Sequence, residues 1–567
     1  MSRHDPIDPA DGIEPGRRLI RAERAGTGAF GPALRDRLRS LASHLSPSAR
    51  ATGPLQLLAA FDDPIAGDVR AGKALLAGKF RWRGASLPLE TLRFDDPRPG
   101  LAEHLHGFGW LRDLSTVATR QQGAPVAEAL VRRWLAGHAR DDQGLPWRAD
   151  IAGRRALAWI AHAPLVLSTR DKGYRLQVLT ALSRQAQRPD QARPGLPRLA
   201  AWSGAVAASL LMAGYAMRRA TAEAGLVRAL SRLVGDDGGT ADRSPESLLD
   251  AVALLTSLRA AYDAAGEEPP LALQATLARA VPALLGATHG DGGLASWQGG
   301  LPLDRAQLAA VIDASGVRAR PLRQARGWGY QRLSGGATVV TVDAAPPPPR
   351  PLGAGGCAST LAFELSDGAH RIVVSCGGAR HEGAALSSQL AQALRATAAH
   401  STLVVGDANS TAVLPDGALG RGVSEVAVDR HELEGGSRLD VSHDGYVRRF
   451  GLTHRRTLAL SVDGRELRGE DALLPAGRST TRAAPFAIRF HLGPAVEGTV
   501  TADGQGALLR TGSGPVWQFR CKGGVLAVED SLWIDPTGRP RATQQLVVSG
   551  ESSPAGLRVS WMLTKAG

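Results

Sequence analysis

The sequence has 567 residues, of which 43% are hydrophobic and 21% charged, as is usual for globular proteins. At roughly 100–200 residues per domain, this length allows two to four domains. The net charge is +13 and comes almost entirely from arginine. This excess is explained either by a GC-rich genome or by an anionic partner, since arginine pairs well with carboxylates and phosphates. The arginines form no long basic block, which argues against nucleic-acid binding.

Cysteine content and the first residues give expectations about location. Three cysteines, with no C-x-x-C pair, are too few for a disulfide framework and fit a reducing compartment. The N-terminus, MSRHDPIDPADGIEPGRR, has no apolar core of a secretory signal. No window approaches the ~18 apolar residues that a membrane-spanning helix needs. We therefore expect a cytoplasmic chain without a transmembrane segment.

Helical periodicity dominates the chain up to about residue 325. Residues 1–70 are less regular: they are rich in Pro and Arg to residue 18, and one helix is expected after that point. In APVAEALVRRWLAGHA, Val126, Leu130 and Trp134 fall on one helical face. Ser244 and Pro245 are expected at the N-cap and first turn of another helix. Further helices are predicted at 153–167, 174–186, 199–217, 209–220, 244–265 and 271–287.

Three loops between these helices share a pattern of acidic residues and glycine. They are DDQGLPWRAD (141–150), GDDGGTADRSP (235–245) and HGDGGLASWQGG (289–300). Glycine after a helix allows a left-handed stop, so helix capping explains the pattern. A ring of helical hairpins, whose loops line a cleft at one end, explains it equally well.

After residue 325 the pattern changes to short runs of alternating or branched residues separated by Gly, Asp and Pro. Such runs are typical of an antiparallel β-sandwich. Asp463-Gly464 is expected at a hairpin turn, and APPPPRPLG (345–353) as a stiff connector between strands. The sequence thus predicts an α+β multidomain protein with an N-terminal extension (1–70), a helical domain (71–325) and a sandwich (326–567). The expected strands are WGYQRL, ATVVTVD, LAFELSDG, HRIVVSCGG, STLVVGD, RRTLALSVDG, FAIRFHL, ALLRTGSG, PVWQFRCKGG, TQQLVVSG and LRVSWML.

An ordered set of motifs resembles the heparinase II/III-like family of polysaccharide lyases. In the second half these are CASTLAFELSDGAHRIVVSCGG, LRATAAHSTLVVGDANS and FAIRFHLGP; in the first half they include FGWLRDL and HGDGGLASWQGG. The resemblance covers roughly residues 75–565 and implies an incomplete α/α toroid packed on a β-sandwich. It also implies β-elimination on an acidic, uronic-acid polysaccharide or oligosaccharide, without a cofactor. That reaction needs a group that neutralises the uronate carboxylate, a base and an acid.

The carry-over of family residues is uneven. His400 matches the histidine of the family's AH-[NS]-T motif, which binds metal near the cleft in zinc-bearing relatives. Cys357 and Ser375 lie where a second histidine and an aspartate are expected, so no metal site is predicted. The helix that should carry an Asn or His, AWSGAVAASLLMAGYAMRRA, contains neither, and its Tyr215 does not match the family tyrosine.

Seven residues remain as candidates for a site. His400 and His289 are the predicted catalytic groups, although either side chain could instead serve only local structure, His400 by bonding a backbone carbonyl and His289 by capping a helix. Two roles are open for Arg243: it could clamp a substrate carboxylate, or it could form a salt bridge to Asp237 or Asp242. The predicted substrate-binding residues are Arg243, Arg395, Asp237, Trp297 and Trp147, the tryptophans as stacking platforms for sugars.

Three functions compete. The leading hypothesis is a lyase that cleaves an acidic polysaccharide by β-elimination, a family activity that is often periplasmic. The second is a catalytically degenerate protein that keeps the fold and binds glycans or other polyanions. The third is a glycosidase that uses paired toroid carboxylates such as Asp237 and Asp291, which requires the two carboxyl groups to lie within ~10 Å of each other.

Overall fold

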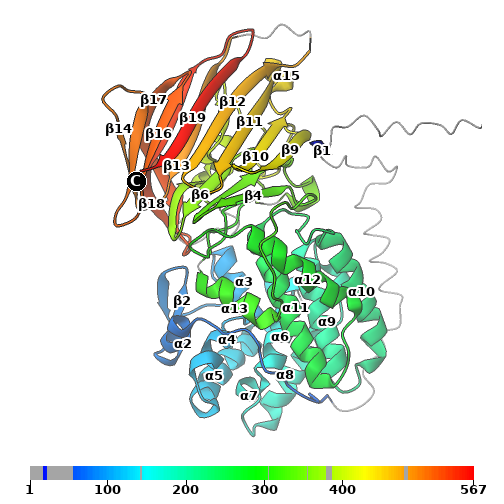
Figure 1. The fold of residues 1–567 in the computed structure, drawn as a ribbon. Coiled ribbons are helices and arrows are strands. Elements are labelled where there is room, and N and C mark those ends of the chain that lie inside the picture. The colour runs from blue at the N-terminus through cyan, green and yellow to red at the C-terminus, as the bar shows by residue number, and fades with distance from the viewer. Residues whose placement is uncertain are drawn as a thin grey trace, which may run out of the picture.

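A computed structural model describes residues 17–21, 55–140, 143–303, 305–353, 355–378, 386–477 and 483–566. Helices form the lower half of the molecule and two large β-sheets form the upper half (Figure 1). This arrangement confirms the predicted fold class. The domain boundaries at residues 70 and 325 stay predictions, and the helix expected after residue 18 falls largely outside the described residues.

The helical half contains one hydrophobic core, which includes the buried Trp110, Trp134 and Trp159. A small hairpin of β2 (Lys79–Trp82) and β3 (Ala85–Pro88) lies beside it. No helix in the described part of the chain has the length and apolar character needed to cross a bilayer. The helices are α2 (Val69–Leu76), α3 (Pro99–Gly107), α4 (Leu111–Val117), α5 (Arg120–His138), α6 (Ala149–Ala161), α7 (Ala163–Val166), α8 (Lys172–Gln185), α9 (Leu196–Leu211), α10 (Arg219–Leu233), α11 (Pro245–Ala265), α12 (Leu271–Gly286) and α13 (Arg305–Ser315).

Most predicted helices are confirmed, but the helix expected at 209–220 is wrong. Helix α9 ends at Leu211, and Met212 instead forms an antiparallel bridge with Leu57. Gly214 has a φ of 78°, which interrupts a right-handed helix before α10 begins. The predicted start of α11 is confirmed, because Ser244 accepts a hydrogen bond from the backbone N–H of Ser247 and Pro245 follows it.

The upper half is a sandwich of a nine-stranded and an eight-stranded sheet. Apolar side chains of both sheets, including Phe363, Phe490 and Trp561, form its core. The nine-stranded sheet runs β1 (Arg17–Arg21), β9 (Glu425–Leu433), β10 (Gly436–His443), β11 (Leu452–Ser461), β12 (Glu466–Pro475), β19 (Leu557–Lys565), β16 (Val516–Lys522), β15 (Gly506–Thr511) and β14 (Val496–Val500). The eight-stranded sheet runs β17 (Val525–Ile534), β18 (Pro540–Glu551), β13 (Pro485–Leu492), β7 (His370–Val374), β6 (Phe363–Asp367), β5 (Thr338–Asp343) and β4 (Tyr330–Gly335), with β8 (Leu403–Val405) beside β13.

Two local predictions in the sandwich are confirmed. Asp463-Gly464 lies at the turn between β11 and β12, which pair antiparallel. The proline-rich stretch 345–353 connects β5 to β6 and contains a short 3-10 helix at Arg350–Leu352.

Strand β1 joins the edge of the nine-stranded sheet although it comes from the first residues of the chain. It pairs antiparallel with β9, and the register places Arg17 opposite Asp429 and Arg21 opposite Glu425. Residues Arg17–Arg21 are therefore extended, so the single helix expected after residue 18 does not begin within this strand. An edge strand has free backbone groups, and pairing with β1 satisfies those of β9.

Candidate functional site

Two of the three acidic, glycine-rich loops reach the sandwich. The loops at 235–245 and 289–300 follow α10 and α12 and meet the residues around β4 to β7 (Figure 1). We call the region where these loops touch the sandwich the junction. Four of the seven predicted site residues, His289, Arg243, Asp237 and Trp297, lie on the two loops.

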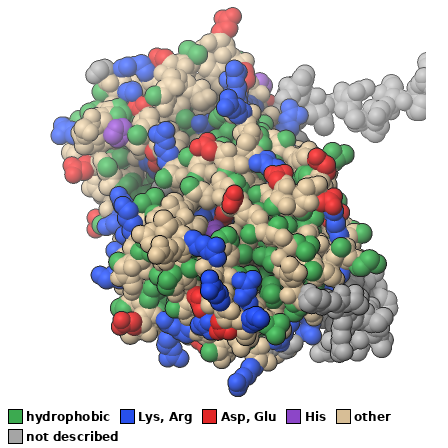
Figure 2. All heavy atoms as spheres, turned by 90° about the horizontal axis from the view of Figure 1, so that it is seen from below, with side chains coloured by type: hydrophobic (Ala, Val, Ile, Leu, Met, Phe, Trp, Pro, Cys, Tyr) green, Lys and Arg blue, Asp and Glu red, His purple; other side chains and the backbone are tan. Residues whose placement is uncertain are grey.

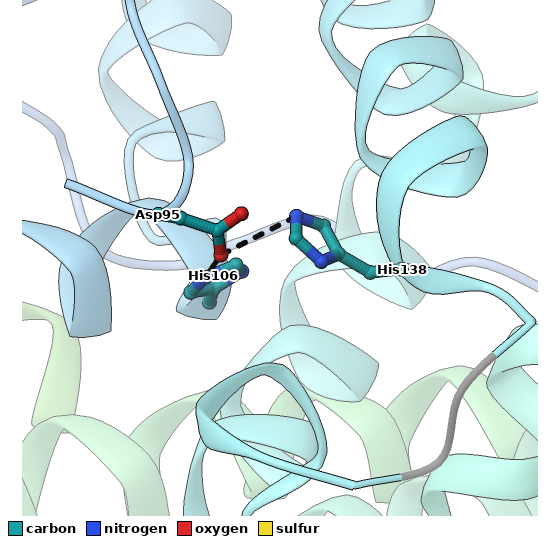
Figure 3. A group of neighbouring side chains, drawn as sticks. All are labelled: Asp95, His106 and His138. Carbon is teal, nitrogen blue, oxygen red and sulfur yellow. Dashed lines mark ion pairs between the residues drawn. The ribbon is translucent and has the colours of Figure 1, made fainter.

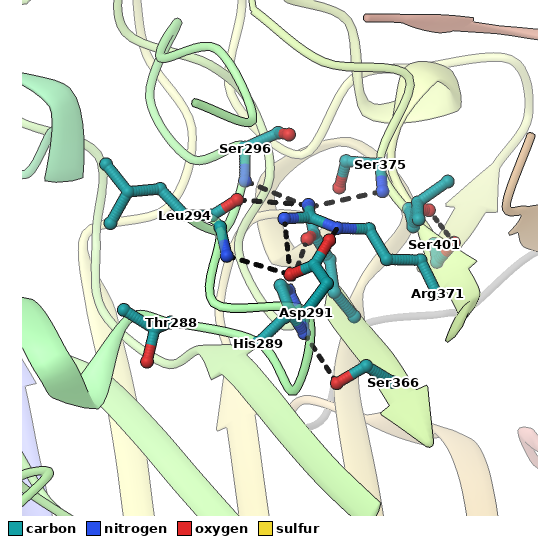
Figure 4. Close-up of polar contacts among 12 residues, drawn as sticks. Thr288, His289, Asp291, Leu294, Ser296, Ser366, Arg371, Ser375 and Ser401 are labelled. Atoms are coloured by element: carbon teal, nitrogen blue, oxygen red, sulfur yellow. Dashed lines mark hydrogen bonds and ion pairs between the residues drawn. The ribbon is translucent and has the colours of Figure 1, made fainter. Parts of the chain in front are cut away.

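His289 is bonded to the sandwich through both ring nitrogens. Nε2 lies 2.8 Å from Oε2 of Glu364 on β6, and Nδ1 lies 3.2 Å from the Ser366 hydroxyl (Figure 4). The imidazole is buried, and burial followed by the positive charge of Arg371 lowers the pKa of His289, although Glu364 pulls it upward. In the neutral ring, Nε2 donates to Glu364 and Nδ1 accepts from Ser366, so both nitrogens are occupied.

The Glu364 carboxylate is fully buried and has further donors. Oε1 accepts hydrogen bonds from the backbone N–H groups of Ser296 (3.2 Å) and Ser375 (3.3 Å). The neighbouring Arg371 forms an ion pair with Asp291, with 2.7 Å between Nε and Oδ2, and also donates to the carbonyl of Leu294 (Figure 4). Ser375, at the position where an aspartate was expected, thus contributes its backbone N–H to the hydrogen bonds of Glu364.

The guanidinium of Arg243 is bonded to acceptors of the protein itself. It is paired with Asp343 at the end of β5 and donates to the carbonyls of Trp328 (2.9 Å) and Pro346 (2.9 Å). Burial would lower the pKa of Arg243, but the charge of Asp343 raises it above the usual value, so the guanidinium remains charged. Arg243 thus forms a salt bridge, as one of the two alternatives expected, but the acid that it pairs with is Asp343 of the sandwich and not a residue of its own loop.

The second oxygen of Asp343 connects three further residues. Oδ2 accepts from Gln298 Nε2 (3.0 Å) and from the Ser359 hydroxyl (2.6 Å). Gln298 in turn accepts from the backbone N–H of Cys357, at 2.9 Å. Both Arg243 and Gln298 have positive φ, 57° and 49°, and a non-glycine residue holds that conformation only where surrounding bonds enforce it. Cys357, at the position where a histidine was expected, joins this network through its backbone N–H, which donates to Gln298.

His400 is fully buried, and neither ring nitrogen has a hydrogen-bond partner among the described residues. Burial lowers the pKa of His400 to about 4, although the charges of Asp343 and Glu364 oppose the shift. The ring is therefore neutral at pH 7. A buried polar group without a partner costs about 1–3 kcal/mol. The histidine lies near both carboxylates of the junction but is bonded to neither.

Arg395 and Asp237 bind backbone groups. Arg395 is buried and donates to the carbonyls of Gly356 (2.7 Å) and Gly417. Asp237 accepts from the backbone N–H groups of Gly327 (2.6 Å) and Trp328 (2.7 Å), so it ties its loop to the chain just before β4. In the glycosidase hypothesis Asp237 would act with Asp291, but protein donors hold both carboxylates.

The two tryptophans occupy different places. Trp297 is fully buried and stacks on Tyr330, with ring centroids 6.1 Å apart and planes inclined by 18°. Trp147 lies away from the junction loops, where its Nε1 donates to the carbonyl of His138 and Arg184 lies 4.6 Å over its ring. A buried ring cannot stack on a sugar without a rearrangement, whereas Trp147 is partly exposed.

Sequence reasoning passed over a basic and aromatic group beside the junction. The His104 ring lies 4.5 Å from that of Trp82, and Arg83 follows on the β2–β3 turn. Burial, then the charges of Arg83 and Arg154, lower the pKa of His104 to about 4. Arg539 of the sandwich donates to the carbonyl of Gly84, which places this turn against the upper half. The run FRWRG was the signal available in the sequence.

A second overlooked group, Asp95, His106 and His138, brings potential metal ligands within 4.8 Å of one another (Figure 3). Asp95 Oδ1 lies 3.8 Å from His106 Nε2 and 3.9 Å from His138 Nε2. However, the Trp134 indole donates to His106 Nδ1 at 3.0 Å, so the neutral His106 ring carries its proton on Nε2. That nitrogen is then a donor facing Asp95, and the group fits a metal ion poorly.

Charged side chains of both signs are mixed on the face of the molecule that is seen from below. Figure 2 shows Lys and Arg side chains spread over the helical end of the molecule, with Asp and Glu among them and hydrophobic side chains between. The positive charge of the whole chain therefore does not by itself mark the junction as a binding site.

These features agree with the comparisons to known proteins. The chain belongs to the heparinase II/III-like family: residues 317–562 match the family model described as Heparinase II/III-like, C-terminal. A relative that spans nearly the whole chain is FtsZ-localized protein C of Caulobacter vibrioides (strain NA1000 / CB15N). It is 32% identical over an alignment of 542 residues, and the match covers 89% of each protein.

Solved structures share the fold. The chain is similar to heparinase III, with a TM-score of 0.66 and 12% identity over 92% of this chain and 88% of that one. It is also similar to a heparan sulfate lyase mutant from Pedobacter heparinus, with a TM-score of 0.61 and 14% identity over 93% and 87%. At such identity the likeness concerns the toroid and sandwich alone, and the chemistry must be argued from this chain's residues.

Proposed function

We propose that this protein is a non-catalytic assembly protein that keeps the heparinase fold and acts together with FtsZ. The observation that carries the proposal is the closed state of the junction. Each predicted catalytic or carboxylate-binding side chain there is buried, and most are bonded to another protein group: His289 to Glu364, Arg243 to Asp343, and His400 in a fully enclosed position.

β-elimination makes demands that this arrangement opposes. A cation must meet the uronate carboxylate, but the guanidinium of Arg243 already faces a carboxylate and backbone carbonyls. A base must approach the sugar, but the ring nitrogens of His289 are both occupied. Opening the junction for a polymer would break several buried hydrogen bonds, each of which is costly to leave unmade.

The partner is suggested by the relative rather than by the site. FtsZ-localized protein C is 32% identical to this chain, with equal coverage of both proteins. The name of that protein associates it with FtsZ. Conservation of the whole fold at this level supports a shared mode of assembly, and the toroid and sandwich then serve as a rigid body that displays binding surfaces.

The proposal predicts binding to FtsZ that does not depend on the junction histidines. Purified full-length protein is expected to bind immobilised FtsZ, with an affinity that changes less than about threefold in the variant His289→Gln/His400→Leu. A matched control is an unrelated arginine-rich protein of similar net charge. The proposal fails if FtsZ is not bound, or if it is bound no better than by the control.

A lyase acting on a uronic-acid polysaccharide or oligosaccharide is the second candidate. It is favoured by the fold and by one observation: the two predicted catalytic histidines both lie near Glu364, His289 by a direct bond and His400 through its electrostatic influence.

Lyase activity has a direct measurement. If this candidate holds, incubation with a panel of uronic-acid polymers produces ultraviolet absorbance from the unsaturated product, and the variant His289→Ala lowers turnover by at least about a hundredfold. Under the assembly proposal we expect no absorbance with any polymer, at pH 5–9 and with or without divalent metals. Turnover by the unaltered protein that the variant abolishes would overturn the non-catalytic assignment.

A further inference from the structure

A line of arginines crosses the outer face of the nine-stranded sheet, on the half of the molecule away from the junction loops. The strand registers place Arg438 opposite Ala459, Ala459 opposite Arg468, Arg468 opposite Met562, and Met562 opposite Arg520. These five residues therefore form one row across β10, β11, β12, β19 and β16. Because the arginines occupy alternate strands, they recur about every 10 Å.

The row lies in a surface groove with a volume of about 540 Å³. Besides the row itself, it is lined by one acidic residue, Glu470, and by Thr457, Gly469, Cys521, Lys522, Ser560 and Trp561. Small and hydroxyl-bearing side chains thus form the floor, and long basic side chains stand along it. In Figure 1 no helix covers this face of β12, β19 and β16.

The groove face is more basic than acidic. Acidic neighbours form ion pairs with the row arginines: Asp440 lies 2.7 Å from Arg438, and Glu466 lies 2.6 Å from Arg468. However, the Arg438 side chain is 45% exposed and the Arg468 side chain is 69% exposed. Such exposed pairs are worth at most about 1 kcal/mol and exchange readily for other carboxylates. On these five strands, all within the described residues, the outward cationic side chains are Arg438, Arg455, Arg468, Arg520, Lys522 and Arg558, and the outward acidic ones are Asp440, Glu466 and Glu470.

The geometry narrows the chemistry of the ligand. The strands of the groove are interior to the sheet, so their backbone groups are already paired and an extended peptide cannot add as a further strand. Recognition must come from guanidinium forks that bind carboxylates and from hydroxyls such as Thr457 and Ser560 that bind other hydroxyls. Among the lining residues Met562 is half-buried and Trp561 is only 3% exposed, so no large apolar side chain stands ready to enter a bilayer.

We propose that this groove binds a linear acidic glycan in which carboxylate-bearing sugars alternate with neutral ones. The polymer lies across the strands, with its carboxylates on Arg438, Arg468 and Arg520 and its neutral sugars over Ala459 and Met562. This site is independent of the junction and of any activity there, and it stands whether or not the protein binds FtsZ.

The test uses hyaluronan oligosaccharides, whose carboxylates fall on every second sugar, as the probe. Full-length protein is expected to bind them in a salt-dependent manner, and Arg438→Ala/Arg468→Ala/Arg520→Ala is expected to weaken binding at least about tenfold. The matched control removes the same charge elsewhere, at the exposed Arg81, Arg318 and Arg320. The control variant is expected to bind within about twofold of the unaltered protein.

The outcomes separate the alternatives. Equal losses in the two triple variants would mean that only net charge matters, and would overturn the site. Binding to anionic phospholipid vesicles or to polyglutamate, but not to the oligosaccharides, would also overturn it, as would no binding at all. Equal melting temperatures of the three proteins verify that the variants are folded, and since the row lies on the surface, we expect them.

Discussion

Replacing Arg243 with methionine is expected to lower the free energy of unfolding by about 3–5 kcal/mol, because it leaves the buried Asp343 carboxylate without its cation. Gln298 and Ser359 would still donate to the carboxylate, but neither carries charge. The measurement is urea unfolding at pH 7, followed by tryptophan fluorescence. Trp328, whose carbonyl accepts a hydrogen bond from Arg243, and Trp297, which stacks on Tyr330, contribute to this signal.

Two further variants make this prediction specific. The double variant Arg243→Met/Asp343→Leu removes both charges and is expected to recover a large part of the lost stability. Arg558→Met breaks an exposed pair with Glu470 and is expected to cost less than about 1 kcal/mol. A loss for Arg243→Met no larger than for Arg558→Met would contradict the structural role of the pair.

Acidification is expected to destabilise the protein between pH 6.5 and pH 4. Burial lowers the pKa of His400 to about 4 and that of His491 to about 3, whereas an unfolded histidine titrates near 6.5. In this window the unfolded chain binds more protons than the folded one, so stability falls as the pH falls. The depressed pKa of His400 alone is expected to lower the free energy of unfolding by roughly 3 kcal/mol between pH 7 and pH 4. Asp113, whose pKa burial raises to about 6, acts in the opposite direction.

The variant His400→Leu isolates one contribution. Leucine removes a buried ring with two unpartnered nitrogens, so we expect a gain of about 1–3 kcal/mol at pH 7 and a shallower loss on acidification. The control is His431→Gln, because His431 is exposed and has no such burial. Thermal midpoints at pH 7, 6, 5 and 4.5 give the comparison. A destabilised His400→Leu at neutral pH would show that the histidine has a partner or a ligand.

The periodic parts of the sequence predicted the fold well. Ser244 and Pro245 predicted the start of α11, and Asp463-Gly464 predicted a turn, because these signals are local. The helix expected at 209–220 was wrong, since Met212 pairs with the distant Leu57 and that contact has no local signal.

The site was harder to predict because its bonds are long-range. His289 was expected to be a catalytic group or to cap a helix, but it is bonded to Glu364, which lies 75 positions away. Arg243 was expected either to clamp a substrate carboxylate or to pair with Asp237 or Asp242 of its own loop, but it is paired with Asp343, which lies 100 positions away. Residue type and position thus identified which side chains are special, while their state, buried and bonded, depends on how the two halves pack.

The edge position of β1 has a consequence for the order of events during synthesis. Residues Arg17–Arg21 leave the ribosome long before β9, which begins at Glu425. At about 5–20 residues per second, roughly 20–80 s pass before the strand meets its partner. The helical half can fold within that interval, so the first strand of the chain is among the last to be incorporated. Nascent chains stopped before Glu425 should therefore leave this segment open to protease, and release beyond Leu433 should protect it.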